Sequence, residues 1–135
     1  MKSRMKPSRG FTLMELLIVM AILAMLAALV GPALFGNLGR GQRSAAQTQM
    51  ESLATALDTY RLAVGRYPRE LEGLIENDTG RDVWKGPYLQ RAEVIPLDPW
   101  GNEYVYTVEG QEFELMSLGA DGAPGGEGDD ADIEL

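Results

Sequence analysis

A single acidic side chain stands close to the start of a long apolar run. Glu15 lies shortly after Gly10, and the residues from Leu16 to Val30 carry no charge. A charged side chain costs about 2.5 to 3.5 kcal/mol at the centre of a membrane helix, and less near the helix end. Cleavage of the chain after Gly10 would give Phe11 a cationic α-amino group. In an assembly of parallel helices, that amine could pair with the Glu15 carboxylate of a neighbouring copy.

The residues before Gly10 favour such processing. They form a short basic leader, containing Lys2, Arg4, Lys6 and Arg9, that the positive-inside rule keeps in the cytoplasm. A secretory signal is cut after its hydrophobic stretch, whereas the small residue here precedes the stretch. Residues 1–10 are therefore interpreted as a removable leader. The alternative is an uncleaved signal anchor whose Glu15 sits among the lipid headgroups.

Residues 11–35 form a hydrophobic segment of membrane-spanning length. About 20 apolar residues are needed to cross a hydrocarbon core of about 30 Å. Gly31 and Pro32 interrupt the segment. Because proline lacks a backbone donor and clashes with the preceding turn, we expect a kink or local melting at this point. An ordinary helix end explains the pair equally well.

Residues 36–65 are expected to continue the helix outside the membrane as an amphipathic half. Apolar residues recur there at intervals of three and four, which predicts a single buried stripe: Ala46, Met50, Leu53, Leu57, Tyr60 and Val64. Gly65 is a suitable residue to end the helix. The result is one long helix from about Phe11 to Val64.

Residues 66–135 are sufficient for one small α+β domain packed on that helix. A short helix is expected from Leu71 to Ile75. Two runs, Glu103 to Val108 and Phe113 to Leu118, alternate around aromatic and apolar residues and predict an antiparallel β-hairpin.

The end of the chain, from Gly119 to Leu135, is rich in glycine and acidic residues. Hard oxygen ligands of this kind suit calcium, which takes 6 to 8 oxygens in flexible geometry. Composition by itself favours the other interpretation, a solvated and disordered acidic tail. The acidic residues concerned are Asp121, Glu127, Asp129, Asp130, Asp132 and Glu134.

Charge and composition exclude several classes of function. The net charge is −8, and removal of the four leader cations leaves eight basic against 20 acidic residues, or −12. Such acidity argues against nucleic-acid binding. The chain has no histidine and no cysteine, and its serines Ser44, Ser52 and Ser117 have no recognisable general base near them in sequence. We therefore expect a protein that is not an enzyme.

The junction from Gly10 to Glu15, with its basic leader, resembles the class III signal of type IV pilins and type II secretion pseudopilins. This resemblance implies that a prepilin peptidase cuts after Gly10 and methylates Phe11, and that Glu15 is the assembly residue. It also implies that the helix can loosen at Gly31 and Pro32 when it enters a filament.

Motifs over most of the remaining chain resemble the major pseudopilins of type II secretion: Leu57 to Tyr60, Gly65 to Pro68, Leu97 to Asn102 and Ser117 to Gly122. That family binds calcium near its C-terminus. The resemblance therefore implies calcium ligands at Asp121, Asp129, Asp130 and the Leu118 carbonyl. The gap between Asp121 and Asp129 is one residue longer than the family's usual spacing, so Glu127 or Asp132 could replace a ligand.

The resemblance implies a type IV pilin-like fold and a structural role in secretion. The expected product is a homopolymeric periplasmic filament, anchored first in the cell inner membrane, that drives export of folded proteins across the outer membrane. Its expected partners are minor pseudopilins, an inner-membrane assembly platform and the prepilin peptidase. The alternative is a type IV pilin subunit that serves adhesion, motility or DNA uptake.

Overall fold

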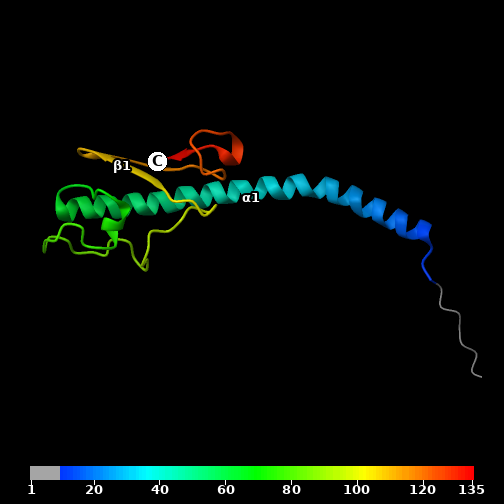
Figure 1. Ribbon diagram of the computed structural model, residues 1–135, viewed down its shortest axis with the longest axis horizontal. Coiled ribbons are helices and arrows are strands. Elements are labelled where there is room, and N and C mark those ends of the chain that lie inside the picture. Colours follow the sequence, from blue (N-terminus) through cyan, green and yellow to red (C-terminus); the bar gives the residue numbers. More distant parts are fainter. Residues whose placement is uncertain (1–9) are drawn as a thin grey trace, which may run out of the picture. The chain divides into compact units, whose positions relative to one another are not determined.

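Helix α1 (Leu13–Val64) dominates the computed structural model, which describes residues 10–135 (Figure 1). The leader therefore lies outside the described residues, apart from Gly10. The helix ends where the sequence predicted, because Gly65 adopts a φ of +90° that side-chain-bearing residues rarely tolerate. The Gly65 amide donates a 2.8 Å hydrogen bond to the Arg61 carbonyl and closes the last turn.

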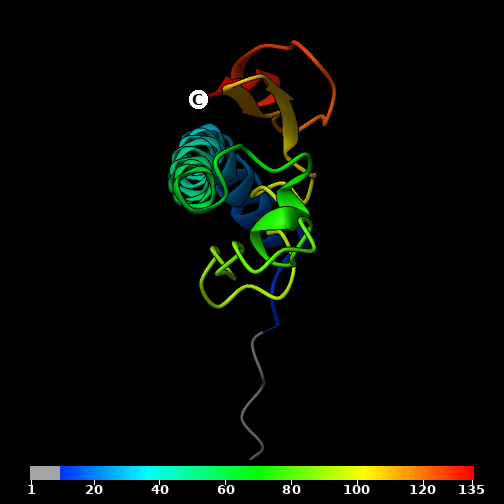
Figure 2. The same ribbon diagram turned by 90° about the vertical axis from the view of Figure 1, so that its left-hand side faces the viewer.

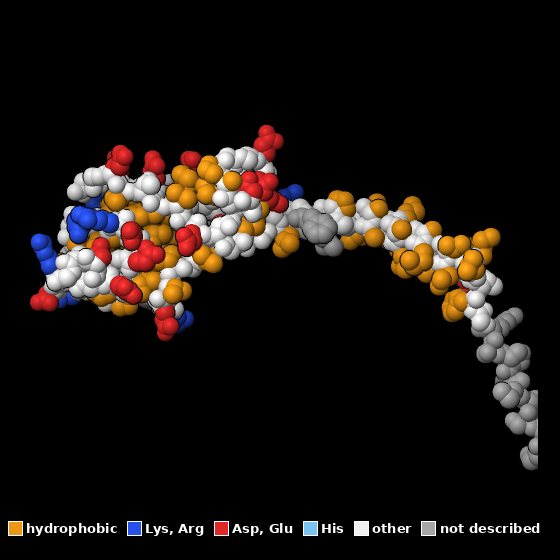
Figure 3. Space-filling view, viewed as in Figure 1, with side chains coloured by type: hydrophobic (Ala, Val, Ile, Leu, Met, Phe, Trp, Pro, Cys, Tyr) orange, Lys and Arg blue, Asp and Glu red, His pale blue; other side chains and the backbone are white. Residues whose placement is uncertain are grey.

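The chain divides into two compact units, Met1–Asn37 and Leu38–Leu135. Within the first unit, α1 exposes apolar side chains along its length (Figure 3). Judged by length and composition, α1 is the one helix among the described residues that could cross a membrane, with a mean hydropathy of 2.8 in its most apolar window. This finding agrees with the predicted membrane segment.

In the second unit, the predicted stripe of α1 forms the centre of the core. Met50, Leu57 and Tyr60 are fully buried, and Val64 at the end of the stripe is partly buried. The helical period of 3.6 residues places all of these positions on one face. Leu71 and Leu74, from the 3-10 helix η1 (Leu71–Leu74), pack into the same core. The predicted short helix is thus a single 3-10 turn.

The sheet has three antiparallel strands in the order β1 (Val105–Glu109), β2 (Glu112–Ser117) and β3 (Ile133–Glu134). The predicted hairpin is confirmed, with a two-residue loop at Gly110 and Gln111. Gly110 has a φ of +61°, the sign that a type II′ turn needs at its first loop residue. Strand β3 was not predicted, because two residues are too short for a recognisable alternation.

Within the second unit, the hairpin and the C-terminal segment lie on one side of α1, and η1 with the loop after it lies on another (Figures 1 and 2). The helix is therefore covered on more than one face. The observed fold is the expected α+β class, a long N-terminal helix with a small antiparallel sheet.

Three tyrosines form hydrogen bonds between separate segments of the second unit. Tyr104 OH donates to Gln49 Oε1 on α1, and Tyr106 OH donates to the Pro68 carbonyl at 2.9 Å. Burial raises the pKa of Tyr104 and that of Tyr106 to about 12 each, because phenolate is poorly solvated there. Burial also raises the pKa of Tyr60, and its hydrogen bond to Asp78 adds to the shift.

Candidate functional site

The predicted assembly residue lies in the first turn of α1. Thr12 caps this helix, since its Oγ1 accepts a 3.2 Å hydrogen bond from the Glu15 amide. The helix dipole favours an acidic side chain at this end, which offsets part of the cost of placing the Glu15 carboxylate near hydrocarbon. Gly10 and Phe11, on either side of the predicted cleavage point, precede the helix and are exposed. The junction is therefore accessible in the subunit.

Helix α1 continues through Gly31 and Pro32, so the subunit has no break in its helix at these residues. Loss of one backbone donor at proline removes a single helical hydrogen bond, and the turns on either side can maintain the helix. The predicted loosening during filament entry stays a prediction about the assembled state.

The acidic C-terminal segment forms a loop that leaves the sheet after β2 and returns as β3. Its start and end are joined where the Ala120 amide donates to the Asp129 carbonyl at 2.9 Å. A 3-10 turn, η2 (Gly128–Asp130), lies within the loop. Gly126 is packed so closely that an added Cβ would lie 2.5 Å from the Asp130 carbonyl oxygen. The segment is therefore an ordered loop tied to the core through Ile133.

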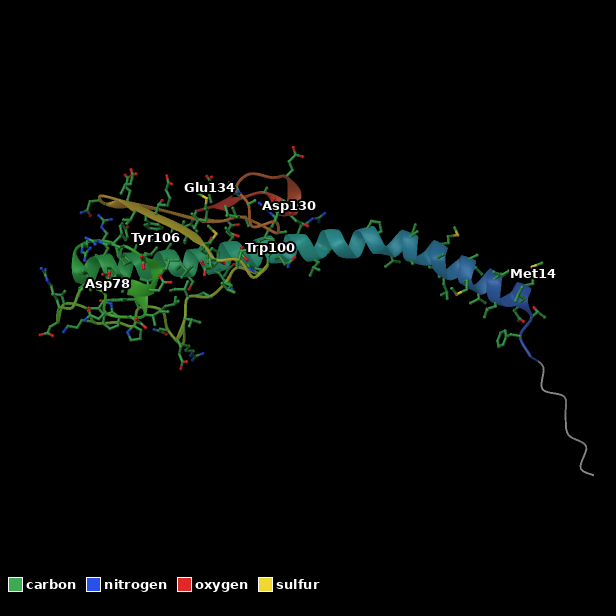
Figure 4. All side chains as sticks on the ribbon, viewed as in Figure 1. Met14, Asp78, Trp100, Tyr106, Asp130 and Glu134 are labelled. Atoms are coloured by element: carbon green, nitrogen blue, oxygen red, sulfur yellow. The ribbon has the colours of Figure 1, made fainter. Side chains whose placement is uncertain are left out.

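The predicted calcium ligands lie in this loop at different points. Asp121 is exposed and its Oδ1 accepts a hydrogen bond from the Ala123 amide at 3.0 Å. Asp129 and Asp130 are exposed on η2, and Asp130 and Glu134 mark this part of the chain in Figure 4. Leu118 directly follows β2. Across residues 10–135, no three acidic side chains converge on one point as a metal cluster would.

Asp132 is a loop carboxylate with one buried oxygen that lacks a hydrogen-bond partner among the described residues. Its Oδ2 accepts a 2.9 Å hydrogen bond from the Gly125 amide, while its Oδ1 is buried and has no hydrogen-bond partner among the described residues. A buried carboxylate oxygen is costly to leave unpaired. Its chemistry fits a hard cation, and sequence reasoning had considered Asp132 only as a substitute ligand.

The base of the loop depends on residues of the motif from Leu97 to Asn102, to which the sequence analysis gave no role in holding the loop. Asp98 is almost fully buried, and its Oδ1 accepts hydrogen bonds from the amides of Trp100 and Asn102. Asn102 Nδ2 then donates to the Gly119 carbonyl at 3.0 Å. The usable signal was the Asp-Pro-Trp-Gly-Asn run itself, which combines an acceptor side chain with a turn.

The comparison with protein families decides the identity. Residues 33–135 match the family described as "Type II secretion system (T2SS), protein G", and residues 5–31 match the "Prokaryotic N-terminal methylation motif". The chain belongs to the type II secretion protein G family. Its members are pseudopilins, so the chain is a structural subunit of the type II secretion pseudopilus.

Relatives of this protein G chain agree over nearly its whole length. A Vibrio cholerae type II secretion system core protein G is 40% identical over 138 residues, which cover 96% of this chain and 92% of that protein. The protein of the same name from Pseudomonas aeruginosa is 41% identical over 133 residues, 92% of each. These matches favour the pseudopilin over the type IV pilin alternative.

A solved structure supports the same assignment. The crystal structure of the major pseudopilin from the type 2 secretion system of enterohaemorrhagic Escherichia coli matches with a TM-score of 0.57 at 30% identity. The match covers 75% of this chain and 91% of that one. The protein G family is a structural family rather than a known family of enzymes, in line with the sequence expectation.

Proposed function

We propose that this pseudopilin is inserted in the cell inner membrane with its second unit in the periplasm, cut after Gly10 by a prepilin peptidase, and methylated at Phe11. The processed subunit then polymerises with copies of itself into a periplasmic filament that drives export of folded proteins. Its proposed partners are minor pseudopilins, which share the filament, and the inner-membrane platform that extends it. Membership of the type II secretion protein G family implies assembly with other secretion components, and this supports the proposal.

The observation that carries the proposal is the placement of Glu15. It is the acidic residue of the first helical turn, and the apolar surface that follows it is exposed. Such a surface requires lipid or other helices around it. Methylation keeps the Phe11 amine cationic, so the amine of one subunit can pair with Glu15 of a neighbour and set the register between them.

The proposal is tested in a deletion strain complemented with the native gene, Glu15→Ala or Glu109→Ala. Glu109 is an exposed acidic residue of β1 and controls for loss of a carboxylate elsewhere. We expect Glu15→Ala to enter the membrane but to trap folded exoproteins in the periplasm, whereas Glu109→Ala exports normally. Export is measured by comparing the amounts of each exoprotein in the culture medium and in the periplasm. Normal filament yield and export with Glu15→Ala would contradict the assembly role.

The same strains distinguish the alternative function. If export is unchanged in the deletion strain and surface fibres or twitching are lost, the chain acts as a type IV pilin. If folded exoproteins are trapped in the periplasm of the deletion and Glu15→Ala strains, the secretion filament is supported.

We propose that the C-terminal loop binds calcium through Asp121, Asp129, Asp130 and the Leu118 carbonyl. The support is chemical: the loop is rich in hard oxygen donors, and the buried Asp132 Oδ1 has no hydrogen-bond partner in the described chain. Because metal binding often completes the folding of its site, the dispersed carboxylates are expected to draw together around the ion. Calorimetric titration of the full-length chain with calcium tests this. Absence of binding at millimolar calcium would exclude it.

A further inference from the structure

Positive and negative side chains are distributed unevenly along this chain. No lysine or arginine follows Arg91, whereas 12 of the 20 acidic residues lie beyond it. Without the leader, the whole subunit carries a net charge of −12. Copies of so acidic a subunit repel one another unless they meet through surfaces of opposite charge. Contacts between copies are therefore expected where a basic surface of one faces an acidic surface of another.

A basic hollow lies at the C-terminal end of α1. It has a volume of about 400 Å³, and none of its six lining residues is acidic: Val64, Gly65, Arg66, Thr79, Arg81 and Val83. Arg66 and Arg81 are both exposed. A guanidinium group presents several donors in one plane, which suits a carboxylate. With two guanidinium groups and two valines, the basic hollow can accept a carboxylate together with its aliphatic stem.

The main chain holds both arginines of the basic hollow in place. The Arg81 amide donates to Thr79 Oγ1 at 3.1 Å, and its carbonyl accepts from Asn77 Nδ2 at 3.2 Å. Arg66 directly follows Gly65, whose positive φ ends the helix. Since the backbone is already ordered, little conformational freedom is lost when a partner binds.

The acidic loop lies at the other end of the second unit (Figure 1). Arg43 of α1 holds it there, because its Nη1 donates hydrogen bonds to the Gly128 carbonyl at 3.0 Å and the Ala131 carbonyl at 2.8 Å. From Arg43 to Gly65, at the basic hollow, α1 advances by about 33 Å at 1.5 Å per residue. The acidic loop of a subunit therefore cannot reach the basic hollow of the same subunit.

Glu127 is a carboxylate of this loop that is free to meet a partner. It precedes η2, its side chain makes no capping hydrogen bond, and it is exposed. It also lies outside the aspartates proposed above for calcium. Its neighbour Gly128 is the residue held by Arg43, so the main chain beside Glu127 has a fixed position.

We propose that the basic hollow binds the acidic loop of a second copy of this chain, with Glu127 of that copy paired with Arg66 and Arg81. The inference rests on the proposed homopolymer and names one surface by which its copies meet. The two surfaces differ, so the contact is heterologous and can repeat from copy to copy. Copies joined in this way are displaced by about 33 Å along α1.

Cross-linking in whole cells tests this contact. The chain has no cysteine, so Arg81→Cys with Glu127→Cys supplies its only two thiols. Within one subunit they lie roughly 30 Å apart, too far for a short bismaleimide to join. A paired arginine and glutamate keep their Cα atoms farther apart than the roughly 7 Å that a disulfide spans, so the bismaleimide is the suitable reagent. We expect a ladder of multimers in denaturing gels.

Three controls define the ladder. Arg81→Cys alone or Glu127→Cys alone should give no ladder, because a chain with one thiol can be joined to only one other. Arg81→Cys with Glu114→Cys should also give none, since Glu114 is exposed on β2, outside the acidic loop. Adding Glu15→Ala to the Arg81 and Glu127 pair should abolish the ladder, because those copies do not assemble.

Exchange of the charges gives a second, independent readout. Arg66→Glu with Arg81→Glu should lower filament yield about tenfold, because acidic groups then face acidic groups. Glu127→Arg should lower it similarly, and all three changes together should restore it to within about twofold of wild type. A misfolded hollow would not be rescued by a change in the loop. The matched control is Arg69→Glu with Lys85→Glu, two exposed residues outside the basic hollow, which should keep the wild-type yield.

The outcomes are distinct. Wild-type filaments with no ladder from the cysteine pair, or no recovery in the triple variant, would overturn the contact and leave the filament proposal in place. A wild-type chain that forms no filament would overturn the homopolymer, and the contact with it. An adduct with a different protein in place of the ladder would overturn a second copy as the occupant of the basic hollow.

Discussion

Ser117 Oγ donates a 2.6 Å hydrogen bond to Oδ2 of Asp98 inside the second unit, and both side chains are buried. The pair joins the end of β2 to the turn that precedes β1. Because Asn102 in that turn also holds the Gly119 carbonyl, the same small network fixes the point from which the acidic loop departs. Asp98 therefore serves as an anchor for the loop and not only as a turn former.

Replacement of Asp98 by alanine should be among the most destabilising polar substitutions in the second unit. The carboxylate accepts from the Ser117 hydroxyl and from the amides of Trp100 and Asn102. A buried donor left without its acceptor costs about 1–3 kcal/mol, so we expect a total loss of about 3 kcal/mol. Urea unfolding of the full chain in micelles measures it. The exposed Asp82→Ala is the control, and equal stability of both variants would refute the anchor.

Leu57 and Leu62 offer a matched test of the core stripe. Leu57 is fully buried, whereas Leu62, on the same helix, is 88% exposed. Leu57→Ala removes packed methyl groups and leaves a cavity, which costs about 2–5 kcal/mol. Leu62→Ala should change the free energy of unfolding by less than about 0.5 kcal/mol. Thermal and urea unfolding compare the two. Similar effects at both positions would mean that the stripe does not carry the core.

Stability should fall at alkaline pH. Burial raises the pKa of Tyr104 and of Tyr106 to about 12, whereas tyrosine in an unfolded chain titrates near 10. The folded state favours the neutral phenols, so their contribution is complete below about pH 10 and is lost as the pH rises toward about 12. Urea unfolding midpoints measured between about pH 10 and pH 12 test this dependence of stability on pH. Tyr104→Phe should flatten it, and a midpoint independent of pH would contradict the burial argument.

Removal of calcium should loosen the C-terminal loop before the helix. If the loop binds the ion, a calcium chelator lowers the unfolding temperature and speeds protease cleavage between Gly119 and Asp132, because a ligand that binds only the folded state stabilises it. Limited proteolysis with mass spectrometry measures this. Asp121→Asn should be cleaved as fast as the wild type in chelator, and added calcium should not slow its cleavage. Unchanged cleavage in the presence of chelator would exclude a role for the ion in loop order.

Much of the fold could be predicted from local patterns. The stripe from Ala46 to Tyr60 has the helical period, and its members are buried as expected. Gly65 ends the helix with a positive φ, and the alternation around residues 105–117 produced the hairpin. These features depend on residues close together in sequence, so each segment carries its own signal.

The candidate cation loop was only partly predictable. Its donor chemistry is visible in the acidic composition, but composition alone favours a disordered tail. Order in the loop comes from β3, which pairs with β2, and from Ile133, which enters the core. A two-residue strand has no pattern of its own, because its partner supplies the hydrogen bonds.

The sequence by itself determined the motif from Gly10 to Glu15, the long helix and the acidic loop, since charge, hydrophobic period and turn residues are local properties. Only the tertiary structure decided that Arg43 holds Gly128, that Gly39 accommodates Asp129, and that Asp98 meets Ser117. The Arg43 contact to Gly128 joins residues 85 positions apart. Contacts of that kind exist only after the chain has packed its loop against the helix, so no pattern along the sequence encodes them.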